Sequence, residues 1–292
     1  MAANGKILVT GATGNVGSSL LEHLIAAEVE VRALTHVESK VPSLRDRGVE
    51  AVVGDFSRPE TLAPAFEEVD RVFLLTPPSQ EQTTFGVNFL DVAKESGNDL
   101  RVVRLSVFKA SHEAPSRLPK QHAEVEDALT SSGLSYTILR PNHFMQNSMA
   151  AAQTVASEGK IYQPFGEGRL GMIDVRDVGE VAAKVLTEEG HEGHTYTLTG
   201  PASISYHDVA AALSEVLNKE VYYIDVPPDV AKGSMMEMGF PEWLADALIE
   251  YAKAFREGYA HSTTDDFERL SGHPATSYEK FAEDFAQVFR GG

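Results

Sequence analysis

The sequence predicts an α/β protein whose core is a doubly wound parallel β-sheet. Short β-branched segments alternate with helical segments of roughly 10–15 residues, as right-handed βαβ crossovers require. The segment VFLLT, residues 72–76, is apolar, which is typical of a strand buried on both faces of its sheet. A glycine-rich turn at residues 11–17 lies directly between the first strand and the first helix. Together these observations indicate a Rossmann-type sheet.

Hydrophobic periodicity and capping residues place the elements in order. Ser57, with Pro59 and Glu60 after it, is expected to cap a helix. The strands are expected at residues 6–10, 29–35, 50–54, 71–76, 101–106 and 135–140, and the helices at residues 16–27, 84–96 and 121–131.

After Pro141 the pattern loosens. Residues 151–172 are rich in glycine and proline and are expected to form a loop, and Asp177 is expected to cap the following helix. The later elements are expected to be a strand at 195–199, a helix from Ser205, a strand at 221–226, a long helical region through Tyr259, and a last helix with Tyr278, Phe281, Phe285 and Phe289 on one stripe.

The change of pattern suggests how the 292 residues are organised. We expect a Rossmann domain over residues 1–150, to which residues 173–200 return. Residues 151–172 and 201–292 are expected to form a smaller C-terminal substrate lobe.

Composition excludes several classes of function. The net charge of −18 argues against nucleic acid or an anionic membrane as a partner, because both repel an acidic surface. The absence of cysteine excludes disulfides and thiolate chemistry. With no signal peptide and no apolar segment near the roughly 18 residues of a membrane span, a cytoplasmic protein is expected; the oligomeric state stays open.

Each glycine of the turn has a physical role. Gly11 permits the tight turn, Gly14 lets the backbone approach a pyrophosphate, and Gly17 allows the helix to pack closely on the strand. The free N–H groups at the start of the helix attract phosphate. The turn therefore predicts a dinucleotide site that also includes Thr13, Asn15 and Val16.

The end of the second strand bears on which dinucleotide binds. Sites that prefer NAD place a carboxylate there, to bond the ribose 2′-hydroxyl. Here the strand ends Leu34–Thr35–His36, and His36 and Lys40 could pair with a 2′-phosphate. NADP(H) is favoured, and NAD(H) stays the alternative.

Several segments, in order, resemble the NmrA-like group of atypical short-chain dehydrogenases/reductases, which is similar to triphenylmethane reductase and NADPH:quinone reductases. These segments are GATGNVG, VRALTHVESK, VVGDF, YTILRPNHFMQN, MIDVRDVGEVAAKVL and YTLTGP. At the position where the family usually reads the 2′-phosphate with arginine, this chain has His36.

The resemblance implies roles for residues after later strands. Asp55 and Phe56 would flank the adenine, and Thr76 and Pro77 would line the cofactor. Ser106 and Val107 would lie near the nicotinamide ribose. Pro141, Asn142, His143 and Phe144 would lie near the nicotinamide and the substrate. Phe108 is a further candidate substrate residue.

The catalytic residues of ordinary short-chain dehydrogenases are missing. No Tyr-x-x-x-Lys occurs in the chain, and the two positions correspond to Leu118 and His122. Without a phenol to exchange a proton, reduction of an ordinary ketone is disfavoured. A substrate that is already electrophilic, such as a quinone, an iminium or an activated double bond, needs less help from an acid.

Three other patterns bear on the site. His122 and Glu126 share a helix face. His122 could contact the cofactor ribose or relay a proton, with Glu126 orienting it, or the two could be a solvated or helix-capping pair. Met236 and Trp243 belong to a Met/aromatic cluster that either walls a substrate pocket or packs a core. His191 and His194 are expected in a surface loop, and no metal site is expected.

Two functions fit these observations. The leading one is an NAD(P)H-dependent reductase that transfers hydride to a small conjugated or aromatic acceptor. The alternative is a non-catalytic redox sensor of the same family that reports the state of its dinucleotide to a protein partner.

Overall fold

In the computed structural model, residues 5–291 are described, and they divide into two compact units. The first unit comprises residues up to 112, 119–140 and 178–196, and the second comprises residues 113–118, 141–177 and 197 onward. The chain thus leaves the first unit at Arg140, before the boundary at residue 150 that the sequence suggests, so Pro141–Phe144 belong to the second unit.

The first unit is built on a seven-stranded sheet, in the order β3-β2-β1-β4-β5-β6-β8. Each described pairing from β3 through to β6 is parallel, and the sequence order reverses between β1 and β4, as in a doubly wound Rossmann sheet. The strands are β1 Lys6–Thr10, β2 Val31–Thr35, β3 Glu50–Val53, β4 Val69–Leu74, β5 Arg101–Leu105, β6 Ser135–Pro141 and β8 Thr195–Leu198.

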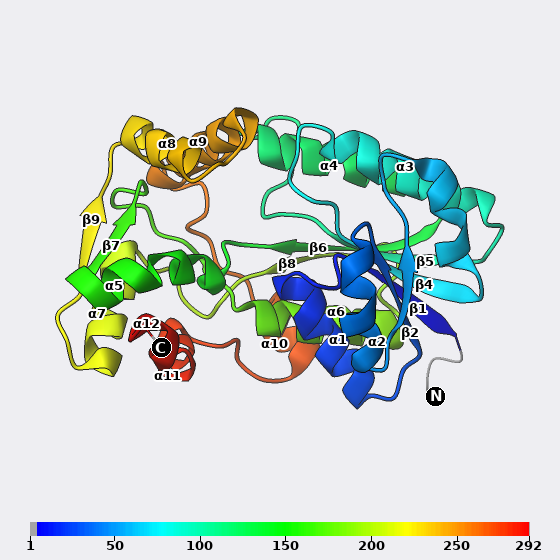
Figure 1. Ribbon diagram of the computed structural model, residues 1–292, viewed down its shortest axis with the longest axis horizontal. Helices are drawn as coiled ribbons and strands as arrows, with labels where there is room; N and C mark the ends of the chain where they lie inside the picture. The colour runs from blue at the N-terminus through cyan, green and yellow to red at the C-terminus, as the bar shows by residue number, and fades with distance from the viewer. Residues whose placement is uncertain (1–4, 292) are drawn as a thin grey trace. The chain divides into compact units, whose positions relative to one another are not determined.

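Helices cover both faces of this sheet (Figure 1). One layer contains α3 and α4, which meet where the Gly86 backbone approaches Val125. The other contains α1, α2 and α6, and Gly179 of α6 lies against Ser19 of α1. The helices are α1 Asn15–Ala26, α2 Val41–Asp46, α3 Gln82–Glu95, α4 Arg117–Thr130 and α6 Val175–Thr187.

One core layer of the first unit lies between the sheet and the α3/α4 layer. Leu8, Val72 and Val102 come from three neighbouring strands and are 0% exposed. Phe89 of α3 and Val125 of α4 cover them and are equally buried. Burial of this apolar surface, at about 25 cal/mol per Å², holds the strands in register and fixes where their carboxyl ends lie.

The second unit contains a small parallel sheet and a set of helices. Ser205 and Asp208 form a capping box at the start of α7, as the predicted helix from Ser205 requires. The elements are β7 Lys160–Gln163, β9 Tyr222–Asp225, α5 Ala152–Glu158, α7 Tyr206–Leu217, α8 Pro228–Glu237, α9 Glu242–Arg256, α10 Asp266–Ser271, α11 Tyr278–Asp284 and α12 Ala286–Phe289.

Three predicted elements of the second unit were wrong. The predicted loop at 151–172 contains α5 and β7, separated by Gly159 at φ 68°. The long helical region is two helices, because Gly239 adopts φ 86° and Pro241 has no N–H to continue a helix. The last helix is interrupted at Phe285, where φ is −106°.

Two predicted caps were also wrong. Ser57 does not begin a helix: its N–H and hydroxyl both donate to the Asp55 carboxylate, at 2.8 and 2.7 Å, in a turn before the 3-10 helix Pro59–Thr61. The helix α6 begins two residues before Asp177, and the carboxylate of Asp174 accepts the N–H of Arg176 at 2.8 Å. Local motifs cannot distinguish two aspartates so close together.

Candidate functional site

The glycine turn has the geometry that a phosphate cradle needs. Gly11 adopts φ 63°, a left-handed conformation that favours glycine, and its carbonyl accepts the N–H of Gly14 at 2.9 Å. Gly14 is the N-cap of α1 and has no side chain to satisfy the first N–H groups of the helix. These donors are therefore available to an anion at the carboxyl end of β1.

Gly14 and Gly17 are glycine for different reasons. A Cβ at Gly17 would lie 2.2 Å from the Gly11 carbonyl oxygen, so close helix–strand packing excludes any side chain. Among the described residues, a Cβ at Gly14 would meet the same oxygen at 3.3 Å and nothing nearer. The space in front of Gly14 is open to a ligand, which fits a pyrophosphate at the helix start.

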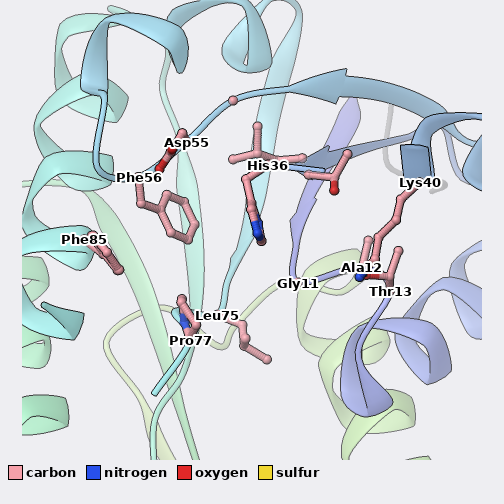
Figure 2. Close-up of a pocket in the computed structure, with 13 residues that line it drawn as sticks. Gly11, Ala12, Thr13, His36, Lys40, Asp55, Phe56, Leu75, Pro77 and Phe85 are labelled. Atoms are coloured by element: carbon pink, nitrogen blue, oxygen red, sulfur yellow. The ribbon is translucent and has the colours of Figure 1, made fainter. Parts of the chain in front are cut away.

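A cavity of about 300 Å³ lies beside this turn (Figure 2). It opens where β1, β2, β3 and β4 end, which is the edge at which open α/β sheets bind ligands. Its walls are Gly11, Ala12, Thr13, Leu34, Thr35, His36, Lys40, Gly54, Asp55, Phe56, Leu75, Pro77 and Phe85.

Cationic or polar side chains border the cavity after β2. His36 and Lys40 are both exposed, and the ammonium of Lys40 donates to the Thr13 hydroxyl at 3.0 Å. Lys40 therefore joins the segment after β2 to the glycine turn. The side chains of His36 and Lys40 project toward the cavity from β2 and the residues after it (Figure 2). This pair suits an anionic substituent on a bound ribose.

Asp55 and Phe56 form the wall contributed by the residues after β3. The hydroxyl of Ser57, and then its N–H, donate to the Asp55 carboxylate and lower its pKa. Phe56 packs against Phe89, with ring centroids 5.6 Å apart, and its carbonyl accepts from Asn88 at 2.8 Å. The wall is thus a fixed aromatic ring beside an ionised carboxylate.

Past the cavity, at the ends of β4 and β5, lies a buried polar cluster. Arg104 of β5 is 0% exposed and donates to the Leu74 carbonyl at 3.1 Å and the Thr76 hydroxyl at 2.9 Å. Its guanidinium also lies 3.3 Å from Nδ1 of His122 on α4. Burial lowers the pKa of Arg104 to about 10, with Glu126 acting in the opposite direction.

The ring of His122 is half-buried beside this guanidinium. Burial, and then the charge of Arg104, hold its pKa well below the ordinary value. His122 is therefore neutral at physiological pH.

Glu126 does not orient His122, as the sequence suggested it would. Its buried carboxylate accepts from the Ser106 hydroxyl and forms an ion pair with Arg140, whose Nε lies 2.9 Å from Oε1. His122 contacts Arg104 instead. Residues four apart share a helix face. Their contacts depend on the strands that lie against that face: β5 carries Arg104 and β6 carries Arg140.

Val107 and Phe108 follow Ser106 in the first unit. The carbonyl of Val107 accepts the N–H of Ala110 at 3.2 Å in a turn. Phe108 is 2% exposed, with the ammonium of Lys109 lying 5.1 Å from its ring centroid. Phe108 is thus a packed residue of the first unit.

The predicted residues after β6 belong to the second unit. Asn142 is buried and donates to the Ala260 carbonyl at 2.9 Å, and its own Oδ1 accepts the N–H of His143 at 2.8 Å. Pro141 is buried, and Phe144 is half-buried and forms a bridge to Ile173. Asn142 therefore fixes the backbone that carries His143 and Phe144.

His143 lies in an aromatic cluster of the second unit. Its ring is 5.5 Å from the centroids of both Phe165 and Phe255, and Nε2 is 3.3 Å from the Tyr206 hydroxyl. Burial lowers the pKa of His143 to about 4 from its usual 6.5. The ring is neutral and packed on at least three sides.

This pKa shift predicts a pH dependence of stability. Below pH 6.5 the unfolded chain binds a proton that the folded protein binds only near pH 4, so the free energy of unfolding falls as the pH drops through this window. We expect His143 to account for about 2 kcal/mol of the fall between pH 7 and pH 5.

His143→Gln should remove that part of the pH dependence. Urea unfolding followed by the fluorescence of Trp243, the single tryptophan of the chain, reports on the second unit. The same dependence on pH in parent and variant would contradict the assignment.

Met236 and Trp243 differ in their surroundings. Met236 is 41% exposed on α8, a helix with no buried residue, so it packs no core. Trp243 of α9 is half-buried, and the guanidinium of Arg117 lies 5.5 Å from its ring. Arg117 also pairs with Glu250. Met236 is therefore free to contact a ligand, whereas Trp243 is already covered on one face.

Of the two histidines that were expected in a surface loop, one is exposed and one is buried. His194 is exposed, but His191 is 9% exposed, and its Nδ1 lies 3.0 Å from the Tyr196 hydroxyl. Within residues 5–291, no group of three or more His, Asp or Glu side chains is arranged to hold a metal ion. Over the same residues, no helix is long and apolar enough to cross a membrane.

Sequence reasoning missed Arg104 and Arg140. Both lie in strands, at Arg101-Val-Val-Arg104-Leu and at Ile138-Leu-Arg140. An arginine inside an otherwise apolar strand is a signal, because a buried guanidinium must be hydrogen-bonded. Which side chains satisfy it depends on neighbouring strands and on α4.

The fold and the edge of the sheet at which the cavity lies define a Rossmann-type protein of the doubly wound class. The NmrA-like family profile matches residues 3–283. The chain is 35% identical to an NAD(P)H azoreductase of Xenophilus azovorans over 283 residues, which cover 97% of this chain and 99% of that protein. It therefore belongs to the NmrA-like family.

Solved structures agree with this membership. An NADPH-dependent quinone oxidoreductase of Escherichia coli, complexed with NADPH, is 26% identical and has a TM-score of 0.86 over 97% of this chain and 99% of that one. The triphenylmethane reductase of a Citrobacter species, complexed with NADP(H), is 28% identical with a TM-score of 0.84 over 96% and 99%.

Proposed function

We propose that this protein is an NAD(P)H-dependent reductase that transfers hydride to a small conjugated or aromatic substrate. The observation that carries the proposal is the open cradle at Gly14, beside a cavity of about 300 Å³ at the carboxyl edge of the sheet. The relatives are an azoreductase, a quinone oxidoreductase and a triphenylmethane reductase, and their names support the same substrate class.

The strand order suggests how a dinucleotide would lie in the first unit. The cavity at the ends of β2 and β3 would take the adenosine half, between Phe56 and His36. The pyrophosphate would meet the N–H groups at Gly14. The nicotinamide half would then extend across the ends of β4 and β5, past Thr76 and Pro77, toward Ser106 and His122.

When bound, the reduced nicotinamide would supply the hydride. The chain would bind it, orient it and exclude water from the reacting end. Ser106 donates its hydroxyl hydrogen to Glu126, so toward a ligand it offers lone pairs and no proton. His122, like the Thr76 hydroxyl, can offer a hydrogen bond without carrying a charge.

Candidate substrate residues are proposed separately for each unit. In the first unit the candidate is Phe108, which is 2% exposed and would have to turn outward to meet a ligand. In the second unit His143 and Phe144 are proposed on the family resemblance, and Met236 on its exposure. Trp243 of the second unit is proposed as an aromatic surface with one face covered by Arg117.

The residues after β2 predict a preference for NADP(H). His36→Asp should reverse the order of affinities, because the carboxylate repels the 2′-phosphate and accepts a bond from a free 2′-hydroxyl. Calorimetry of both proteins with NADPH and NADH tests this. A parent that prefers NADH tenfold or more, about 1.4 kcal/mol, would contradict the assignment of His36 and Lys40 to the phosphate.

The reductase activity has a direct test. The purified protein is incubated with NADPH and a panel of quinones, triarylmethane dyes, azo dyes and activated alkenes, and loss of the nicotinamide absorbance is followed. We expect turnover on at least one class. Tight NADPH binding with no turnover on any of them would favour the redox-sensor function instead.

A further inference from the structure

The contacts of Arg104 are unusual for a buried arginine. The side chain is 0% exposed, and its three hydrogen-bond contacts are the Leu74 carbonyl, the Thr76 hydroxyl and Nδ1 of His122, at 3.1, 2.9 and 3.3 Å. None of these is a carboxylate. Among the residues that the structure describes, its Nε has no hydrogen-bond partner. A buried cation so weakly neutralised is costly, so its position needs an explanation beyond packing.

The contact with His122 restricts the chemistry of the imidazole. A guanidinium has five N–H donors and no acceptor. Nδ1 of His122 must therefore accept, which means that it carries no hydrogen. In a neutral ring the hydrogen is then on Nε2. A doubly protonated ring would direct an N–H at the guanidinium, and both charge and geometry oppose it.

We propose that Arg104 is a positioning residue that fixes His122 in the Nε2–H tautomer, so that His122 acts on the substrate as a neutral hydrogen-bond donor and not as a proton relay. This inference rests on the proposed reductase function for the place of the substrate. The arrangement of the two side chains themselves is independent of it.

The neighbouring charges support this role. Glu126 is the carboxylate of α4 in this cluster. It accepts a hydrogen bond from the Ser106 hydroxyl and forms an ion pair with Arg140 of β6. To give its Nε2 proton to a substrate without becoming an imidazolate, His122 would have to start as an imidazolium, and the guanidinium beside Nδ1 opposes that second positive charge. The lowered pKa of His122 is what this environment produces.

The reduction balances without an imidazolium. The substrate gains one hydrogen and two electrons as hydride, and the reduced nicotinamide becomes the oxidised form. The negative charge that develops on a quinone oxygen or an azo nitrogen is stabilised by the His122 N–H and by the positive charge of Arg104 behind it. One proton is then taken from water to complete the product.

A spectroscopic experiment tests the tautomer without using activity. The protein labelled with ¹⁵N in its histidines is compared with His122→Phe to assign the His122 signals. At pH 7 we expect a protonated Nε2 and an unprotonated Nδ1 in the parent and in Arg104→Lys, which keeps a donor. In Arg104→Met we expect a mixture of tautomers. A parent in which Nδ1 is protonated would overturn the inference.

A kinetic experiment tests the role of the donor. Glutamine can accept from Arg104 through its oxygen and donate through its amide, but it cannot relay a proton. On a quinone that the parent reduces, His122→Gln should keep kcat within about tenfold, whereas His122→Phe should lose about 10²–10³-fold. Equal large losses in both variants would indicate a relay, and no loss in either would remove His122 from the reaction; each result overturns the proposal.

The two experiments separate this inference from the proposed function. If no substrate is reduced, the proposed function fails, and the ¹⁵N spectra still decide whether Arg104 fixes the tautomer. If substrates are reduced but the spectra show Nδ1–H, the inference fails and the reductase stands.

Discussion

Gly14→Val is expected to abolish dinucleotide binding while leaving the protein folded. The valine side chain would occupy the space in front of the helix start that the pyrophosphate needs. Within the protein the new Cβ meets the Gly11 carbonyl oxygen at 3.3 Å, so that atom has to move by only a few tenths of an ångström. Gly14 has φ −86° and ψ 176°, which valine adopts readily.

We expect the affinity for NADPH to fall at least 100-fold, about 2.8 kcal/mol. The cost in stability is that of a poorer N-cap, about 1 kcal/mol. Titration of NADPH fluorescence and thermal unfolding of the same preparations measure the two effects separately.

Gly233→Val is the matched control for this experiment. Gly233 lies in α8, and apart from its chain neighbours and the backbone of its own helix no described atom lies within 4 Å of a Cβ built there. The control makes the same chemical change in the second unit, so its NADPH affinity should equal that of the parent. If Gly14→Val binds NADPH normally, the turn is not the phosphate cradle.

Gly17→Ala is expected to have the opposite profile, with a large loss of stability. Its Cβ would lie 2.2 Å from the Gly11 carbonyl oxygen, 2.7 Å from the Gly11 carbonyl carbon and 2.8 Å from Cα of Ala12. These are backbone atoms of the turn itself, so α1 has to move away from β1. Overpacking of this kind costs about 1–3 kcal/mol, and the rigid backbone places Gly17 at the upper end.

Chemical denaturation of Gly17→Ala, followed by far-UV circular dichroism, measures the loss. NADPH binding by Gly17→Ala should fall only by the fraction of molecules that are unfolded or in which α1 is displaced. A variant as stable as the parent would contradict the close approach of α1 to β1. Substitution of Gly14 should therefore reduce the affinity for the ligand, whereas substitution of Gly17 should reduce the stability of the fold. Both glycines belong to the same sequence motif.

Much of the first unit could be predicted from sequence because its signals are local. The alternation of strands and helices, the apolar segment at 72–76 and the glycine turn each depend on residues close together in the chain. The family resemblance implied places beside the cofactor for Asp55, Thr76 and Ser106, and all three follow strands whose carboxyl ends meet at one edge of the sheet.

The second unit was harder because its helix boundaries depend on single residues. Gly239 and Pro241 separate α8 from α9, and nothing in the hydrophobic periodicity on either side marks that break. The local sequence predicts Asp177 as a helix cap. Its carboxylate instead accepts the N–H of Thr276 at 2.8 Å, and Thr276 lies 99 residues further along the chain. A capping motif is local, whereas this partner is brought in by folding.

The sequence by itself predicted the fold class and the glycine turn, because both follow from backbone requirements that only certain residues meet, and its motifs resembled the family to which the chain belongs. Only the tertiary structure decided the partners of His122 and Glu126. Their spacing of four places both on one face of α4, yet β5 presents Arg104 to the first, and β6 presents Arg140 to the second. Which cation meets which side chain depends on strand order and register, and these arise from packing across the sheet.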